Sequence, residues 1–180
     1  VASELGRHVI EYMIAHDFDV SHFTYLKEEY GGKVARRYPK ENGELDSVRE
    51  TTPREQGLPH GFAFVVKRLF NNKPRMILPI FENTCYPPNQ PTPKRSYEFG
   101  RAIAGAVKSW DSDARVAIIG SGGLSHFVVD EWLDRTVLKA LEEKDAETLM
   151  TIPRNHLYSA ASETQNWIVV GGAMQDTGLN

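Results

Sequence analysis

The stretch that most constrains this chain is Ala117–Phe127, AIIGSGGLSHF. With the two residues before it, it opens as RVAIIG, an apolar, β-branched run that is typical of a buried strand. A small-residue loop ending in Gly122-Gly123 follows, and it leads directly to His126. In open α/β sheets, ligands bind beyond the carboxyl ends of the strands. The pattern therefore favours a functional site to which a loop presents His126.

Two other interpretations of this loop stay open. Gly120–Ser125 is close to the dinucleotide-binding pattern G-x-G-x-x-G, but it lacks the third glycine. The acidic residue expected about 20 positions further on is replaced by Ala140. The alternative to a nucleotide loop is an ordinary tight turn that carries a hydrogen-bonded histidine.

Composition excludes several classes of protein. The 180 residues are 41% hydrophobic and 25% charged, which suits one soluble domain with a real core. With 21 Lys and Arg against 24 Asp and Glu, the net charge is −3. The chain thus has no excess of positive charge that would bind nucleic acid or an anionic membrane. We see no membrane span and no secretory signal. A single cysteine, Cys85, excludes an internal disulfide, so we expect a cytoplasmic protein.

Hydrophobic periodicity predicts alternating helices and strands. Helices are expected over Ser3–His16, with Ser3 as N-cap, and over Phe62–Phe70, Lys94–Trp110, Val128–Lys144 and Ala146–Ile152. Strands are expected over Phe18–Phe23, Arg75–Phe81 and Arg115–Gly120. Lys27–Gln56 is polar and interrupted by glycines, which indicates a long surface excursion. Glu163–Val170 is open between helix and strand, because Gly171-Gly172 would weaken a helix there.

A strand, a helix and a second strand at this spacing form a βαβ unit with a right-handed crossover. We therefore expect an α/β protein with three layers, α/β/α, around a central mixed or parallel sheet. Residues 1–180 would form a single catalytic-type domain. Because Val1 runs almost at once into a helix and nothing closes the fold before Asn180, we expect this domain to be truncated at both ends.

Three polar residues fall at notable positions. His60 stands at a helix start, where the dipole disfavours imidazolium, although it could merely cap that helix. His126 follows a strand, and Glu163 lies at the start of a helix that would stabilise its charge. A His–His–Glu set could be an acid/base group or a metal site, and spacing does not choose between them. Three further histidines are expected to be surface or capping residues: His8, His16 and His22.

Several motifs together resemble one enzyme family. They are Asn83-Thr84 with its proline-rich continuation, Pro93-Lys94-Arg95, Val116–Gly120, Gly122–His126, Ala161-Ser162-Glu163, Trp167 and Gly172-Ala173-Met174. This set resembles the class III extradiol ring-cleavage dioxygenases, especially the β-subunit type of protocatechuate 4,5-dioxygenase and its gallate and methylgallate relatives. The resemblance extends from about Gly57 to Met174, and its most specific part is GGLSH with the glutamate downstream.

The resemblance implies an Fe(II) enzyme with two histidines and one carboxylate as ligands. Glu163 matches the carboxylate ligand, His126 the catalytic acid/base histidine, and His60 a second histidine that orients or stabilises bound oxygen or the substrate hydroxyl. The two iron-binding histidines are expected from a segment N-terminal to this chain. The implied substrates are O2 and a protocatechuate- or gallate-like catechol. A homodimer or a small second subunit is also implied.

Two other functions compete with this reading. A chain without its iron-binding histidines could be a non-catalytic or degenerate subunit that keeps the fold and binds a partner. A metal-dependent hydrolase could use the same three residues, but neither GxSxG nor HExxH occurs in the sequence. Iron content and oxygen uptake with a catechol separate the dioxygenase from both, and zinc content would indicate the hydrolase.

Overall fold

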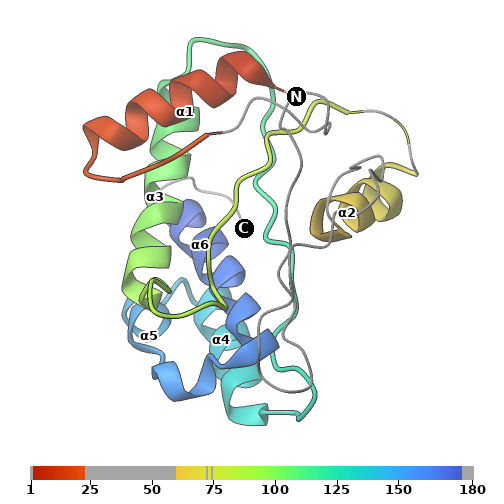
Figure 1. Ribbon diagram of the computed structural model, residues 1–180, viewed down its shortest axis with the longest axis vertical. Coiled ribbons are helices and arrows are strands. Elements are labelled where there is room, and N and C mark those ends of the chain that lie inside the picture. Colours follow the sequence, from red (N-terminus) through yellow and green to blue (C-terminus); the bar gives the residue numbers. More distant parts are fainter. Residues whose placement is uncertain (1, 23–59, 72, 74, 176–180) are drawn as a thin grey trace, which may run out of the picture. The chain divides into compact units, whose positions relative to one another are not determined.

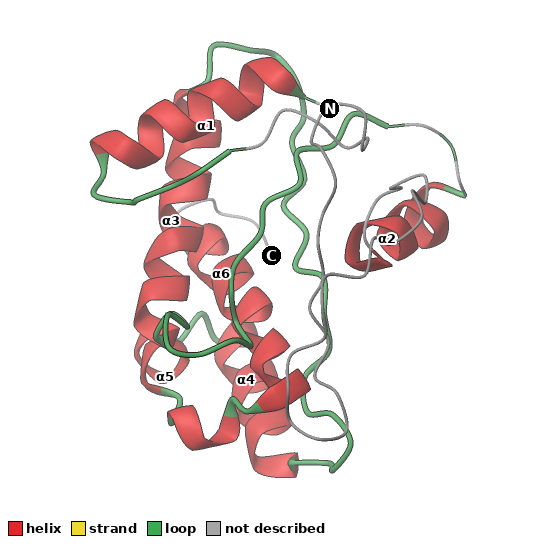
Figure 2. Cartoon of the chain, viewed as in Figure 1, coloured by secondary structure: helices red, strands yellow, loops and turns green. Residues whose placement is uncertain are grey.

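The chain is described by a computed structural model that covers residues 2–22, 60–71, 73 and 75–175. It divides into two compact units, Ser21–Pro74 and a larger unit made of Val1–Val20 with Arg75–Asn180. The described part consists of helices and loops, and none of its residues forms a strand (Figure 2). The long excursion expected at Lys27–Gln56 lies outside the described residues.

The elements follow one another in a simple order. The smaller unit contains α2, His60–Phe70. The larger unit contains α1 (Ser3–Ala15), α3 (Pro93–Ser109), α4 (Glu131–Glu142), α5 (Ala146–Thr151), the short 3-10 turns η2 (Arg154–His156) and η3 (Ser159–Glu163), and α6 (Thr164–Met174). Within the described ranges, no helix is both long and apolar enough to span a bilayer.

Helices α3 and α6 form the centre of the larger unit (Figure 1). Glycines let their backbones approach closely: a Cβ on Gly100 would lie 1.8 Å from the carbonyl oxygen of Val169, and one on Gly172 would lie 2.0 Å from that of Tyr97. This contact explains why Gly171-Gly172 lies inside α6 although glycine weakens a helix by about 1 kcal/mol relative to alanine. The open choice at this segment is thereby decided in favour of a helix.

Two apolar clusters stabilise the larger unit. One joins α1 to α3, and its buried members are Leu5, Val9, Met13, Ala102, Ile103 and Ala106. The other joins α3, α4, α5 and α6, and its buried members are Tyr97, Leu133, Val137, Ala140, Leu149, Ile152, Leu157 and Ile168. Side chains three and four residues apart share one face of a helix, as Leu5, Val9 and Met13 of α1 do.

The prediction of a three-layer α/β/α fold with a central sheet is wrong for the described chain. Arg75–Phe81 and Arg115–Gly120 are extended, but they form no β-ladder with any described segment. Three of their side chains, Leu78, Ile80 and Ile118, pack on the cluster of α1 and α3. Met76 and Ile119 are exposed. An apolar run predicts an extended chain packed on a core, but a strand also needs a hydrogen-bonded neighbour.

The prediction of a third strand over Phe18–Phe23 is also wrong for the described residues, 18–22, which form a loop. Phe18 instead packs its ring against Phe99 of α3 at a centroid distance of 5.5 Å, and the Arg95 guanidinium lies 3.7 Å above it. The N-cap of α1 is Ala2 rather than Ser3, with no side-chain capping bond. The expected helix over Ser3–His16 is otherwise confirmed, ending at Ala15.

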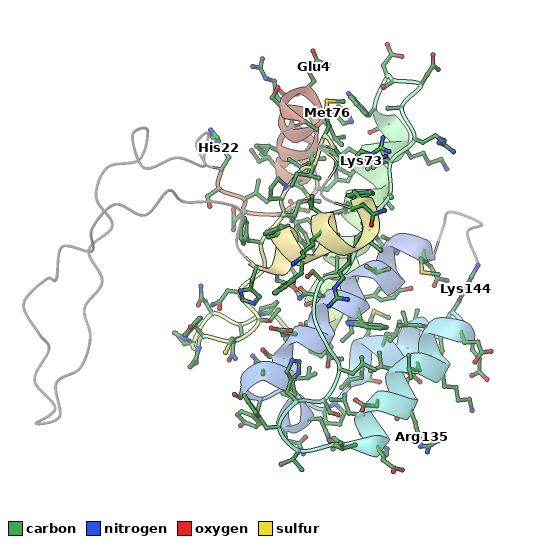
Figure 3. The ribbon with its side chains drawn as sticks, turned by 90° about the vertical axis from the view of Figure 1, so that its right-hand side faces the viewer. Glu4, His22, Lys73, Met76, Arg135 and Lys144 are labelled. Carbon is green, nitrogen blue, oxygen red and sulfur yellow. The ribbon has the colours of Figure 1, made fainter. Side chains whose placement is uncertain are left out.

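Helix α4 begins later than the expected Val128, because Asp130 caps it by accepting a hydrogen bond from Leu133 N at 3.0 Å. Its outer face is charged, as Glu131 and Arg135 pair at 3.5 Å one turn apart. Figure 3 shows Arg135 and, just beyond the helix, Lys144 extending away from the helices.

Candidate functional site

The loop that follows the extended segment 115–120 is shaped around two side chains. A Cβ on Gly122 would lie 2.9 Å from Glu163 Cβ, and one on Gly123 would lie 2.7 Å from His126 Cε1. Gly122 also has φ +143°, a conformation that side-chain-bearing residues rarely adopt. The two glycines therefore make the room in which His126 and Glu163 lie.

Helix α6 holds this loop in place. Asn166 Nδ2 donates to the carbonyl oxygen of Ser121 at 2.6 Å, and Trp167 Nε1 donates to that of Gly122 at 3.0 Å. Both donors come from the first turn of α6, immediately after Glu163. The same turn that carries the carboxylate thus fixes the loop that carries the histidine.

His126 and Glu163, 37 positions apart in the sequence, meet at this loop. Nε2 of His126 lies 3.6 Å from Oε2 of Glu163, and their side chains are 30% and 40% exposed. That distance is too long for a direct hydrogen bond. Oε2 of Glu163 accepts instead from the backbone N–H of Gly123 at 3.2 Å. The pair is close, ordered by its surroundings and open to solvent on one side.

The hydrogen bond of the other ring nitrogen fixes the protonation pattern of His126. Nδ1 lies 2.9 Å from the carbonyl oxygen of Leu124. Because a carbonyl oxygen only accepts, Nδ1 must carry the hydrogen. In the neutral ring, Nε2 then has the free lone pair, and it is the atom nearer Glu163. His126 can therefore take up or release a proton at Nε2 while its ring stays oriented.

A further contact fixes the loop from α4. Ser125 donates twice to Asp134, from its backbone N to Oδ1 at 2.8 Å and from Oγ to Oδ2 at 2.7 Å. This bidentate contact holds the residue directly before His126. The sequence reasoning missed Asp134. Its signal was an acid in the first turn of a helix that follows the loop within ten residues, where a carboxylate can reach back to loop donors.

A second pair of a histidine and a carboxylate, also missed, lies at the start of α4. Nδ1 of His156 lies 2.6 Å from Oδ2 of Asp130, and the His156 ring packs on Trp132 at a centroid distance of 4.4 Å. The hydrogen bond from His156, followed by that from Leu133 N, lowers the pKa of Asp130 below its ordinary value. This pair ties η2 to the start of α4.

The remaining histidines differ in position. His60 is the first residue of α2, as the sequence predicted, and its exposed ring lies 6.4 Å from that of Phe64 one turn on. It belongs to the smaller unit, and its role stays a prediction. His8 contacts Ala106 O at 2.9 Å, joining α1 to α3, and His16 contacts Tyr12 O at 2.7 Å at the end of α1. His22 is exposed.

The fit to a metal ion can be judged from the donor set. Glu163 is a half-exposed carboxylate held at one oxygen by a backbone N–H, which suits a ligand of a divalent ion. Across the described ranges, however, no three His, Cys, Asp or Glu side chains come together as a metal cluster. The described residues thus bring one carboxylate, that of Glu163, next to one imidazole, and by themselves they do not complete a three-ligand site.

Comparison with known proteins identifies proteins to which the chain is similar. A family model described as the catalytic LigB subunit of aromatic ring-opening dioxygenase matches residues 1–180. Gallate dioxygenase from Pseudomonas putida is 28% identical over 130 residues, which cover 71% of this chain and 29% of that protein. The match thus spans less than a third of the relative's length. No solved structure matches the chain.

Proposed function

Since the chain belongs to the LigB family of aromatic ring-opening dioxygenases, we propose that it contributes to Fe(II)-dependent extradiol cleavage of a catechol-type aromatic acid by O2. The substrate class would be protocatechuate- or gallate-like. The observation that carries the proposal is the meeting of His126 and Glu163 at 3.6 Å across a glycine loop built around both. The name of the gallate dioxygenase relative supports the substrate class.

Glu163 is proposed as the carboxylate ligand. Its Oε2 is oriented by Gly123 N and its side chain is partly open to solvent, so it can reach an ion without a large rearrangement. A site of two imidazoles and one carboxylate suits Fe(II) and leaves positions for other ligands. The two imidazoles are expected from histidines outside the motifs described above. When bound, the iron would supply Lewis acidity and oxygen chemistry.

His126 is proposed as the acid/base residue. A catechol must lose protons from its hydroxyl groups before both oxygens can chelate an ion. Nε2 of His126 has the lone pair that can accept such a proton, because Nδ1 donates to Leu124 O. The same nitrogen can return the proton later in the reaction. The double hydrogen bond between Ser125 and Asp134 would keep the ring positioned through both steps.

His60 is proposed to orient the substrate hydroxyl or stabilise bound oxygen. His60 is the first residue of α2 and its ring is exposed, so it is open to a bound molecule. A neutral ring can donate one hydrogen bond and accept another.

A homodimer or a small second subunit is also part of the proposal, and light scattering of the purified protein would test it.

The experiment that tests this function compares His126→Ala and Glu163→Ala in the protein as its gene encodes it. Oxygen uptake is measured with protocatechuate and gallate, and iron by elemental analysis. We expect His126→Ala to lower kcat by about 10²–10⁴-fold with iron retained, and Glu163→Ala to lose the iron. His16→Ala, which changes an exposed histidine at the end of α1, is the matched control. Unchanged kcat in His126→Ala would show that the acid/base role is wrong.

One observation favours a second candidate, a non-catalytic subunit of the same family. Among the described residues, no three potential metal ligands come together. A wild-type protein that holds no iron and consumes no oxygen with either catechol would support this candidate. Bound zinc with esterase or amidase activity would instead support a hydrolase.

A further inference from the structure

A chain of buried polar side chains lies beneath the turn that carries Glu163. Ser96 of α3 is fully buried, and its Oγ lies 2.9 Å from Oε1 of Glu82 and 3.1 Å from Oε1 of Gln165. Glu82 follows the extended segment 75–81, whereas Gln165 is the second residue of α6. The three side chains thus connect the extended segment to the residue two positions after Glu163.

The hydrogens available in this chain do not suffice if Glu82 is ionised. A serine hydroxyl has one hydrogen to donate. Both of its close neighbours present oxygen atoms, Oε1 of Glu82 and Oε1 of Gln165, and an ionised carboxylate only accepts. One of the two oxygen–oxygen contacts would then lack a hydrogen. A protonated Glu82 supplies it, donating to Ser96 Oγ while Ser96 donates to Gln165.

The surroundings of the other carboxyl oxygen of Glu82 also favour the protonated form. Oε2 is buried and has no hydrogen-bond partner among the described residues. A buried carboxylate oxygen without a donor makes the charged form costly. Burial accordingly raises the pKa of Glu82 to about 7, and the hydrogen bond that Ser96 can donate to the ionised form offsets only part of this effect.

We propose that Glu82 is a neutral carboxylic acid that acts as a positioning residue: it donates to Ser96, Ser96 donates to Gln165, and this relay holds the first turn of α6 so that Glu163 faces His126. A second bond supports the same turn from the same segment, since Ser162 Oγ donates to Thr84 Oγ1 at 3.3 Å in a buried position. The turn is thus tied on both sides of Glu163. Only the role given to Glu163 rests on the proposed function.

Infrared spectroscopy tests the protonation directly. At about pH 6, exposed carboxyl groups are ionised, so a protonated buried acid has a C=O stretch of its own. We expect the spectrum of the wild type minus that of Glu82→Gln to show this band. The spectrum of the wild type minus that of Glu98→Gln should lack this band, because Glu98 is a partly exposed glutamate of α3. If Gln165 turned its Nε2 toward Ser96, Glu82 could stay ionised; the absence of the band would reveal this and overturn the proposal.

Rescue by an isostere tests the positioning. A glutamine at 82 can still donate to Ser96, whereas an alanine cannot. We expect Glu82→Ala and Ser96→Ala to speed amide hydrogen exchange in the first turn of α6 and to weaken Fe(II) binding about 10–100-fold. Glu82→Gln should restore both properties. Equal impairment in Glu82→Gln and Glu82→Ala would overturn the proposal. If Glu82→Ala does not fold, Ser96→Ala takes its place in this comparison.

Failure of the proposed function remains distinguishable. If the wild type binds no Fe(II), the dioxygenase function is rejected, but the infrared band and the exchange rates still report on the relay. If the wild type binds Fe(II) and these variants exchange and bind as the wild type does, the relay is rejected and the dioxygenase function stands.

Discussion

Gly122 and Glu163 lie so close together that residue 122 has no room for a side chain. A Cβ on Gly122 would lie 2.9 Å from Cβ of Glu163 and 3.0 Å from its Oε2. The backbone at Gly122 is also in a conformation, φ +143°, that favours glycine. The loop and the carboxylate therefore depend on each other for their positions.

Gly122→Ala should displace the carboxylate of Glu163. The added methyl group would occupy its place, and the backbone strain alone should cost about 1–3 kcal/mol in the free energy of unfolding. We expect loss of bound iron together with a lower midpoint in urea. Elemental analysis and urea unfolding measure the two effects.

Gly6→Ala is the control for that experiment. A Cβ on Gly6 of α1 would lie 3.2 Å from Leu78 Cδ1, the far end of a side chain that can shift. Iron content should stay at the wild-type level in this variant. If Gly122→Ala also keeps its iron, Glu163 is not positioned as described, or it is not a ligand.

Trp167→Phe should loosen the loop without removing the aromatic ring. The variant loses the hydrogen bond from Nε1 to the carbonyl oxygen of Gly122, which is worth about 1 kcal/mol. We expect that decrease in the free energy of unfolding, and faster amide exchange at Gly122 and Gly123. Trp132→Phe, in which a ring that packs on His156 is changed, should not alter exchange in the loop. If amide exchange at Gly122 and Gly123 is the same in both variants, the hydrogen bond from Trp167 does not hold the loop.

The sequence was informative where a function depends on local pattern. GGLSH identified His126, and a resemblance to a family identified Glu163, although no periodicity links residues 37 positions apart. Their meeting at 3.6 Å results from the packing of α6 against the loop. This packing joins two distant segments, so no local sequence pattern predicts it. The role of each residue remains a proposal.

The fold class was predicted less well, because apolar runs do not determine pairing. Arg75–Phe81 and Arg115–Gly120 have the composition of strands and are extended, yet no described segment pairs with them. The helices were predicted better, since the 3.6-residue period acts within one segment, although the predicted N-cap, Ser3, was wrong. Even so, the close contact of Gly100 and Gly172 with the opposite helices shows why two glycines can stand inside helices.

Gly172→Ala should separate α3 from α6. The new Cβ would lie 2.0 Å from the carbonyl oxygen of Tyr97, and a backbone atom cannot move aside as a side chain can. We expect a loss of about 3 kcal/mol or more in the free energy of unfolding, measured in urea. Gly171→Ala is the matched control, because its Cβ would meet only the terminal methyl groups of Leu149 and Leu141. A similar loss in both variants would contradict the close helix contact.

The protonation of Glu82 makes stability depend on pH in a direction opposite to that of most acids. Its pKa is raised from an ordinary 4.5 to about 7 in the folded protein. Between these values the unfolded chain has released the proton and the folded chain has kept it. The unfolded state thus binds fewer protons, so the free energy of unfolding falls as pH rises.

We expect this contribution to be fully present below about pH 4.5 and to fall by up to about 1.4 kcal/mol per pH unit until about pH 7, with no further loss above. Urea unfolding of the wild type and Glu82→Gln across pH 4.5–8 measures it as a difference. Subtraction removes other groups, such as Asp130 and Asp145, whose lowered pKa values act in the opposite direction at more acidic pH. The difference should decline with pH, because the glutamine does not titrate. A difference that stays constant would mean that folding does not raise the pKa of Glu82, which would contradict the prediction.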